Sequence, residues 1–216
     1  MFVYEPDGAS TPRAKKIIQV AQFADQCRMG KGSSFGSPVR WLAGLALIGA
    51  MWALAFAQDD KIPGLSYVNV GLHQLGHMLT YASSDVTNSL AGPIAQVAIP
   101  ALLAVYFFLR RGDWVLAGVF LVWAATSALE VSLYVADAPK PTLSLLGDDQ
   151  NDWALILGPN GYDVMEKAPS LADKIHNGAT IAAGIGFLIC LAAPLSGRRR
   201  QPAGTAAASR ATAASS

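Results

Sequence analysis

Two histidines stand four positions apart in the stretch VNVGLHQLGHMLT, residues 68–80. In a helix this spacing projects His73 and His77 from one face, about 6 Å apart, so both imidazoles can reach one metal ion. Zinc peptidases use the same spacing in H-E-x-x-H, where the glutamate takes a proton from metal-bound water. Gln74 stands at the position of that catalytic glutamate, and an amide does not accept a proton near neutral pH. The stretch therefore predicts metal binding more directly than it predicts hydrolysis.

A catalytic zinc ion needs a third protein ligand, usually His, Asp or Glu. Asp137 is the first candidate, because it follows the third apolar run and is expected on the same side of the membrane as the histidines. His176 is the second, since it comes just before the fourth apolar run and lies at a similar depth. Asp152 and Asp149 are further candidates. The preferred zinc site thus joins Asp137 to the histidine pair.

Glu130 stands inside an apolar run, where a carboxylate is costly and normally faces a partner or a cavity. Helical spacing puts it on one face with Ser127, Tyr134 and Asp137. One interpretation makes Glu130 a relocated base that acts on the metal-bound water. The other, which we favour, is a protonated or hydrogen-bonded carboxyl that holds helices together.

The composition indicates that these residues belong to a membrane protein. Of the 216 residues 52% are apolar and 14% are charged, and the mean hydropathy is +0.34. A helix needs about 20 apolar residues to cross roughly 30 Å of hydrocarbon. Four runs are long enough or nearly so: residues 41–57, 90–109, 114–136 and 178–195. We therefore expect an all-α, polytopic membrane protein with about four transmembrane helices.

In the second run, Gly92, Pro93 and Gln96 indicate a closely packed helix with Gln96 in an interhelical hydrogen bond.

The basic residues favour four crossings over five. Lys and Arg collect on the cytoplasmic side of membrane proteins. With the N terminus inside and four crossings, the basic residues of segment 1–40, Arg110, Arg111 and the cluster 198–200 are all cytoplasmic. A fifth crossing at residues 62–84 would move Arg110, Arg111 and that cluster to the far side.

Residues 62–84 are then expected to form an amphipathic or re-entrant helix on the extracytoplasmic side. At about 100° per residue, the polar side chains share one broad arc and the apolar ones fall opposite. The polar arc consists of Asn69, His73, Gln74, His77, Thr80, Tyr81 and Ser84. Such a helix can bury its apolar side in lipid or against neighbours, and it turns both histidines toward a hydrated interior.

The remaining segments complete the expected domain organisation. Residues 1–38 are predicted to form a polar cytoplasmic segment, and residues 197–216 a disordered cytoplasmic tail. Residues 39–196 form the membrane domain between them. Its largest polar loop, residues 137–176, is expected outside the cytoplasm, with a short helix near residues 162–176.

Several of these stretches together resemble a known group of proteins. The stretch HQLGH, the proline- and glutamine-containing span after it, SLYVADA and LLGDDQNDWALIL are similar to bacterial multi-pass membrane proteins. That uncharacterised group is related in pattern to the site-2 protease family of intramembrane zinc metalloproteases. The resemblance runs from about Val68 to Trp153. In site-2 proteases two histidines and an aspartate from a later membrane helix hold the zinc, which by resemblance correspond to His73, His77 and Asp137. That family carries the histidine helix as a true span, so five crossings remain the alternative.

The chain departs from the family pattern at positions that matter for catalysis. Gln74 replaces the glutamate, an Asn-Pro-Asp-Gly signature is absent, and Asn151 stands where the bacterial group has a histidine before the Asp-Trp pair. The resemblance implies a zinc-binding protein of the bacterial inner membrane with weak or no peptidase activity. The distribution of basic residues predicts that both termini are cytoplasmic.

Two alternative functions stay open. One is an active intramembrane metalloprotease that uses Glu130 or an outer aspartate as its base. The other is a non-catalytic membrane interaction partner. The expected partners are the lipid bilayer and a membrane-protein partner or substrate, and a net charge of +1 gives no indication of nucleic-acid binding.

Overall fold

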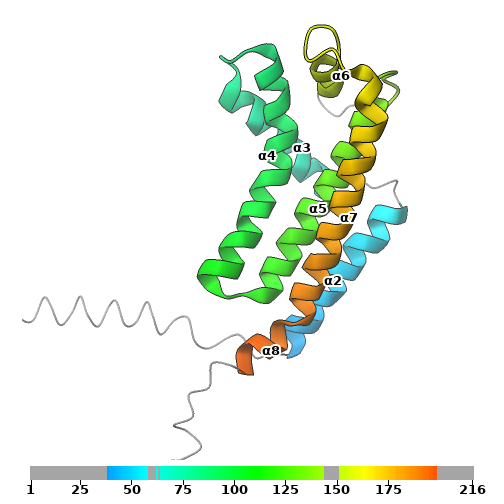
Figure 1. Cartoon of the computed structure of the whole chain (residues 1–216). Coiled ribbons are helices and arrows are strands. Elements are labelled where there is room, and N and C mark those ends of the chain that lie inside the picture. The colour runs from blue at the N-terminus through cyan, green and yellow to red at the C-terminus, as the bar shows by residue number, and fades with distance from the viewer. Residues whose placement is uncertain (1–37, 58–61, 63, 144–150, 199–216) are drawn as a thin grey trace, which may run out of the picture. The chain divides into compact units, whose positions relative to one another are not determined.

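The structure is a computed structural model that describes residues 38–57, 62, 64–143 and 151–198. These residues form helices and connecting turns, with no strand among them. The long helices are α2 (Pro38–Ala57), α4 (Asp85–Tyr106), α5 (Trp114–Asp137) and α7 (Ala168–Leu191), and the shorter ones are α3 (Leu65–Thr80), α6 (Asp152–Leu157) and α8 (Ala193–Arg198) (Figure 1). A π-helical turn, η1 (Phe107–Arg111), extends α4, and a 3-10 turn, η2 (Met165–Lys167), precedes α7. The predicted all-α fold is confirmed, whereas residues 1–37 and 199–216 of the predicted terminal segments lie outside the described residues.

Four helical segments are long and apolar enough to cross a membrane. They are Pro38–Ala55, Asp85–Arg111, Trp114–Asp137 and Met165–Leu191. Within the described part of the chain, α3 is not one of these segments. The structure therefore has the four membrane-length helices and the separate histidine helix that the sequence predicts.

The long helices alternate in direction. Arg40, in the first turn of α2, pairs with Asp113 at the start of α5, and Trp41 Nε1 donates to the carbonyl of Cys190 near the end of α7. The start of α2, the α4–α5 connection and the end of α7 therefore lie together at one end of the bundle. Four successive crossings require this alternation.

The fourth long helix begins earlier than its apolar run indicates. The predicted short helix at residues 162–176 and the predicted span at residues 178–195 are joined, because α7 runs continuously from Ala168 to Leu191. Pro169 does not interrupt it, since proline lacks a backbone N–H, and in the first helical turn that N–H would have had no intrahelical partner. The structure also adds α6, where the Asn151 side chain caps the helix by accepting from the N–H of Trp153.

The histidine helix α3 turns its polar side toward the protein. Asn69 is buried, and His73 and His77 are half-buried. The apolar side chains on the other faces are exposed: Tyr67, Val68, Leu75, Met78 and Leu79. A contiguous apolar surface of this kind is typical of contact with a membrane or a partner. The helix therefore has the division into polar and apolar sides that its periodicity predicts.

The path of α3 is oblique to the long helices. Asn69, in its second turn, is bonded to Trp123 and Ser127 near the middle of α5. Thr80, at its other end, is bonded to Asn88 at the start of α4. The helix thus runs from the middle of the bundle to one end, as a re-entrant segment does.

The central helix of the bundle is α5. It contacts α2, α4 and α7. In the apolar 18-residue stretch of each membrane-length segment, 67% of the residues are buried in α5, against 22–28% in the other three. A polar side chain on α5 therefore has to find its hydrogen-bonding partner within the protein.

Candidate metal centre

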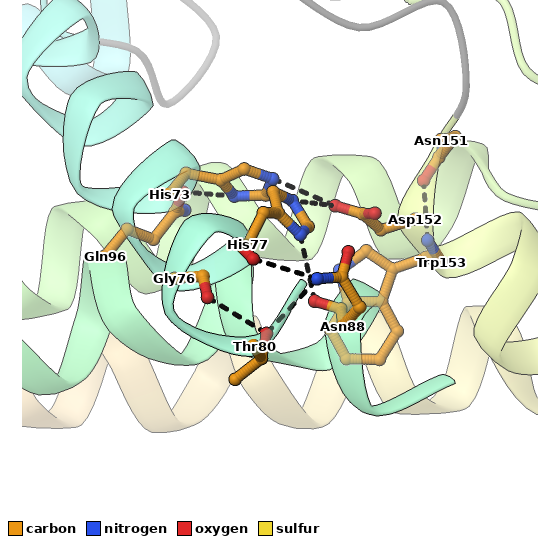
Figure 2. Close-up of polar contacts among 9 residues, drawn as sticks. All are labelled: His73, Gly76, His77, Thr80, Asn88, Gln96, Asn151, Asp152 and Trp153. Atoms are coloured by element: carbon orange, nitrogen blue, oxygen red, sulfur yellow. Dashed lines mark hydrogen bonds and ion pairs between the residues drawn. The ribbon is translucent and has the colours of Figure 1, made fainter. Parts of the chain in front are cut away.

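Three side chains from two elements converge at the end of the bundle where α4 begins. They are His73 and His77 of α3 and Asp152 of α6, and one ligand atom from each lies within 4.8 Å of the others. The Nε2 atoms of His73 and His77 are 2.9 and 3.3 Å from the same oxygen, Oδ2 of Asp152 (Figure 2). Neighbouring ligands of a tetrahedral zinc ion lie about 3.3 Å apart. This group could therefore hold a metal ion.

Contacts on the other ring nitrogen assign the proton of His77. Its Nδ1 atom lies 2.9 Å from the backbone carbonyl of Asn88. A carbonyl oxygen only accepts, so in the neutral imidazole Nδ1 carries the proton and Nε2 keeps its lone pair. Metal-bound histidines usually have this second contact, which sets the tautomer and the orientation of the ring.

His73 has the same proton arrangement. Its Nδ1 atom lies 3.0 Å from Oε1 of Gln96, and the amide nitrogen of Gln96 donates to the carbonyl of Ser127. With the amide turned this way, Oε1 accepts from Nδ1 and leaves the Nε2 lone pair available. The predicted role of Gln96 as an interhelical hydrogen-bonding group is confirmed, because it links α3, α4 and α5.

In neutral rings with the proton on Nδ1, the Nε2 lone pairs of His73 and His77 both face Oδ2 of Asp152. Nε2 of His77 is buried and has no hydrogen-bond partner among the described residues. Two lone pairs and a carboxylate at these distances repel each other, and an unsatisfied buried acceptor costs about 1–3 kcal/mol. A cation at the centre removes both penalties. The donor set and the unpartnered Nε2 atom thus fit a metal ion.

Glycines make room for this group between α3 and α4. A Cβ atom on Gly76 would lie 2.2 Å from the carbonyl oxygen of Ala91, so only a glycine allows the two helices to cross this closely. A Cβ atom on Gly92 would lie 2.5 Å from Nε2 of His77 and 2.7 Å from Nε2 of His73. The close packing predicted at Gly92 is therefore confirmed, and its neighbours are the two ligand atoms themselves.

Asp152 is held in place by the packing of α6. Ile156 and Leu157, one turn further along, are buried in a cluster with Val131 and Val135 of α5 and Ala172 of α7. The Asn151 amide also donates to the carbonyl of Tyr134 on α5. The packing of α6 therefore fixes the position of Asp152 next to the histidines.

Gln74 lies beside the metal-ligating group. A pocket of about 200 Å³ adjoins the histidines and is lined by Gln74, His77, Asn88, Ser89, Asn151, Asp152 and Leu155. Gln74 is thus at the place where the glutamate of H-E-x-x-H would act, and it presents an amide there.

The structure brings Asp152, and not Asp137 or His176, to the histidine pair. Asp137 Oδ1 accepts from the Thr142 N–H at 2.9 Å and from the Thr142 hydroxyl at 2.8 Å, so this carboxylate holds the turn after α5. His176 is half-buried on α7, outside the group of close ligand atoms. Asp149 lies outside the described residues. The sequence names Asp152 only as a further candidate, because nothing in it indicates that α6 folds back onto α4.

Glu130 forms a buried link between α3 and α5. It is 6% exposed, and its Oε2 atom accepts from the Asn69 amide at 2.7 Å. The Asn69 oxygen in turn accepts from Trp123 Nε1 at 2.9 Å and from Ser127 Oγ at 3.0 Å. These contacts match the interpretation of Glu130 as a hydrogen-bonded carboxyl between helices. Glu130 is not a member of the group around the histidines.

Comparison of the chain with protein-family models, with curated proteins and with solved structures finds no match.

Proposed function

We propose that this protein is a multi-pass protein of the bacterial inner membrane that binds zinc through His73, His77 and Asp152, with weak or no peptidase activity. The observation that carries the proposal is the unpartnered Nε2 atom of His77, 3.3 Å from Oδ2 of Asp152. Both termini face the cytoplasm in this proposal, since that orientation leaves most basic residues inside.

The donor set favours zinc over the harder cations. Two imidazole nitrogens and one carboxylate are the ligands of many catalytic zinc sites, whereas Ca²⁺ and Mg²⁺ prefer oxygen ligands. With three protein ligands, a tetrahedral ion has one further position for water or another molecule. Bound zinc would polarise whatever occupies that position.

The neighbouring side chains argue against efficient peptide hydrolysis. A hydrolase needs a base within hydrogen-bonding distance of the water, and Gln74 cannot accept its proton. Glu130 is engaged by Asn69 at 2.7 Å. The resemblance to site-2 proteases therefore extends in this proposal to the histidine helix and the metal, and not to full catalytic activity.

Metal analysis of the full-length protein in detergent tests the proposal. We expect about one zinc ion per chain in the wild type, and a loss of affinity of at least about tenfold in His77→Ala and Asp152→Ala. Asp137→Asn and His176→Ala are matched controls that should keep the metal. Stoichiometric zinc in the double variant His73→Ala/His77→Ala would refute the assignment, and zinc loss in Asp137→Asn but not in Asp152→Ala would restore the site predicted from the sequence.

A further inference from the structure

The pocket beside the metal-ligating group has a polar lining with little negative charge. Among the described residues around it, Asp152 is the one carboxylate and Leu155 the one aliphatic side chain. Asn88 donates to the carbonyl of His77 and to Thr80 Oγ1, so its amide is already engaged. By contrast, Gln74 and Ser89 line the pocket with no hydrogen-bond partner for their side chains in the described part of the chain. Their amide and hydroxyl groups are available to a bound molecule.

With a metal ion bound, as in the proposed function on which this inference rests, the net charge of the site favours an anionic ligand. A divalent ion bound by two neutral imidazoles and one carboxylate keeps a net positive charge. The side chains of His73, His77 and Asp152 are only 25%, 14% and 15% exposed, so solvent screens that charge weakly. An anionic molecule in the remaining coordination position balances it.

Gln74 is suited to hold such an anion. Its amide offers two N–H donors. A glutamate at the same position would present a second negative charge and repel the anion. The substitution that removes the catalytic base of H-E-x-x-H therefore also creates a donor for a metal-bound carboxylate.

We propose that this pocket binds a small polar carboxylate, with one oxygen on the metal ion and the other accepting a hydrogen bond from Gln74. A volume of about 200 Å³ leaves room for a molecule of several heavy atoms, since a water molecule takes about 30 Å³. With a single leucine in its lining, the pocket offers an acyl chain little apolar surface. The ligand is therefore a water-soluble carboxylate and not a fatty acid.

Acetate titration of the Co²⁺-loaded full-length protein in detergent tests this inference. The visible absorption of a Co²⁺ ion reports a change in its ligands. We expect a saturable change with acetate, no change with the neutral analogue acetamide at the same concentration, and no tighter binding of octanoate. Gln74→Glu should weaken acetate binding at least about tenfold through charge repulsion. Gln74→Leu, which removes the donor without adding charge, should weaken it less.

The Co²⁺ content of each variant is measured first, so the two proposals fail separately. A wild-type protein without Co²⁺ would refute the metal site. A loaded wild type whose spectrum does not respond to acetate, or responds equally to acetamide, would refute the carboxylate site alone. Equal acetate affinity in wild type, Gln74→Glu and Gln74→Leu would also refute it. Tighter binding of octanoate than of acetate would refute a water-soluble ligand and indicate a fatty acid instead.

Discussion

At the scale of single residues, the metal-ligating group depends on what lies next to each ring nitrogen. A backbone carbonyl holds the proton of His77 on Nδ1, at 2.9 Å, and the Gln96 oxygen does the same for His73 at 3.0 Å. On the Nε2 side of both rings lies Gly92, and a Cβ atom at this position would occupy the space next to the two Nε2 atoms. The lone pairs are thus directed into one small volume, where the Asp152 carboxylate meets them.

The space at Gly92 leads to a prediction for the metal. Gly92→Ala should lower zinc affinity at least about tenfold, because a Cβ at 2.5 Å from His77 Nε2 must displace the ring, and overpacking costs about 1–3 kcal/mol. Zinc content after dialysis against a chelator measures this. Gly184→Ala is the control, since a Cβ there has nothing within 4 Å. Equal zinc retention in both variants would mean that the rings move aside without cost.

At the scale of the elements, α3 is fixed by one close crossing and one buried network. Gly76 lets α3 approach the backbone of α4, and Asn69 ties it to Glu130, Trp123 and Ser127 of α5. Within the described part of the chain, the apolar side of α3 is exposed. The histidines therefore keep their position because two helices hold the polar side.

The crossing at Gly76 can be tested on stability. Gly76→Ala should destabilise the protein by about 1–3 kcal/mol, because a Cβ only 2.2 Å from the Ala91 oxygen forces α3 away from α4. Gly71→Ala, on the same helix but with nothing within 4 Å of its Cβ, should be neutral or stabilising by up to about 1 kcal/mol. Denaturant titration followed by tryptophan fluorescence measures both. A larger loss in Gly71→Ala would contradict the described α3–α4 contact.

At the scale of the whole molecule, the direction of the long helices determines where the metal-ligating group can lie. Arg40, Asp113 and Cys190 meet at one end of the bundle, whereas Asn88 and Asp152 belong to the other. If the N terminus is cytoplasmic, as we propose, the metal-ligating group lies near the extracytoplasmic surface. Its pocket would open to that side of the membrane.

Reporter fusions test this orientation. Alkaline phosphatase inserted after Asn160, an exposed residue between α6 and α7, should be active, and a fluorescent protein fused after the C terminus should fluoresce. Both outcomes follow from four crossings with cytoplasmic termini. An inactive phosphatase at Asn160 together with a fluorescent N-terminal fusion would require α3 to cross the membrane as a fifth span.

The sequence by itself determined the features that are local along the chain. Hydropathy identifies the four membrane-length helices, and helical periodicity places Asn69, His73 and His77 on the polar side of α3, because both depend only on near neighbours. The start of α7 was harder to predict from the sequence. Its first turns, from Ala168, are polar and resemble a loop when they are considered apart from the apolar run that follows.

Only the tertiary structure decided which carboxylate meets the histidines. Asp152 is 79 positions from His73, and it arrives there because the apolar residues of α6 pack against α5 and α7. The link from Glu130 to Asn69, across 61 positions, has the same origin. Such pairs depend on how helices pack side by side, and local periodicity carries no information about the partner that a helix face meets.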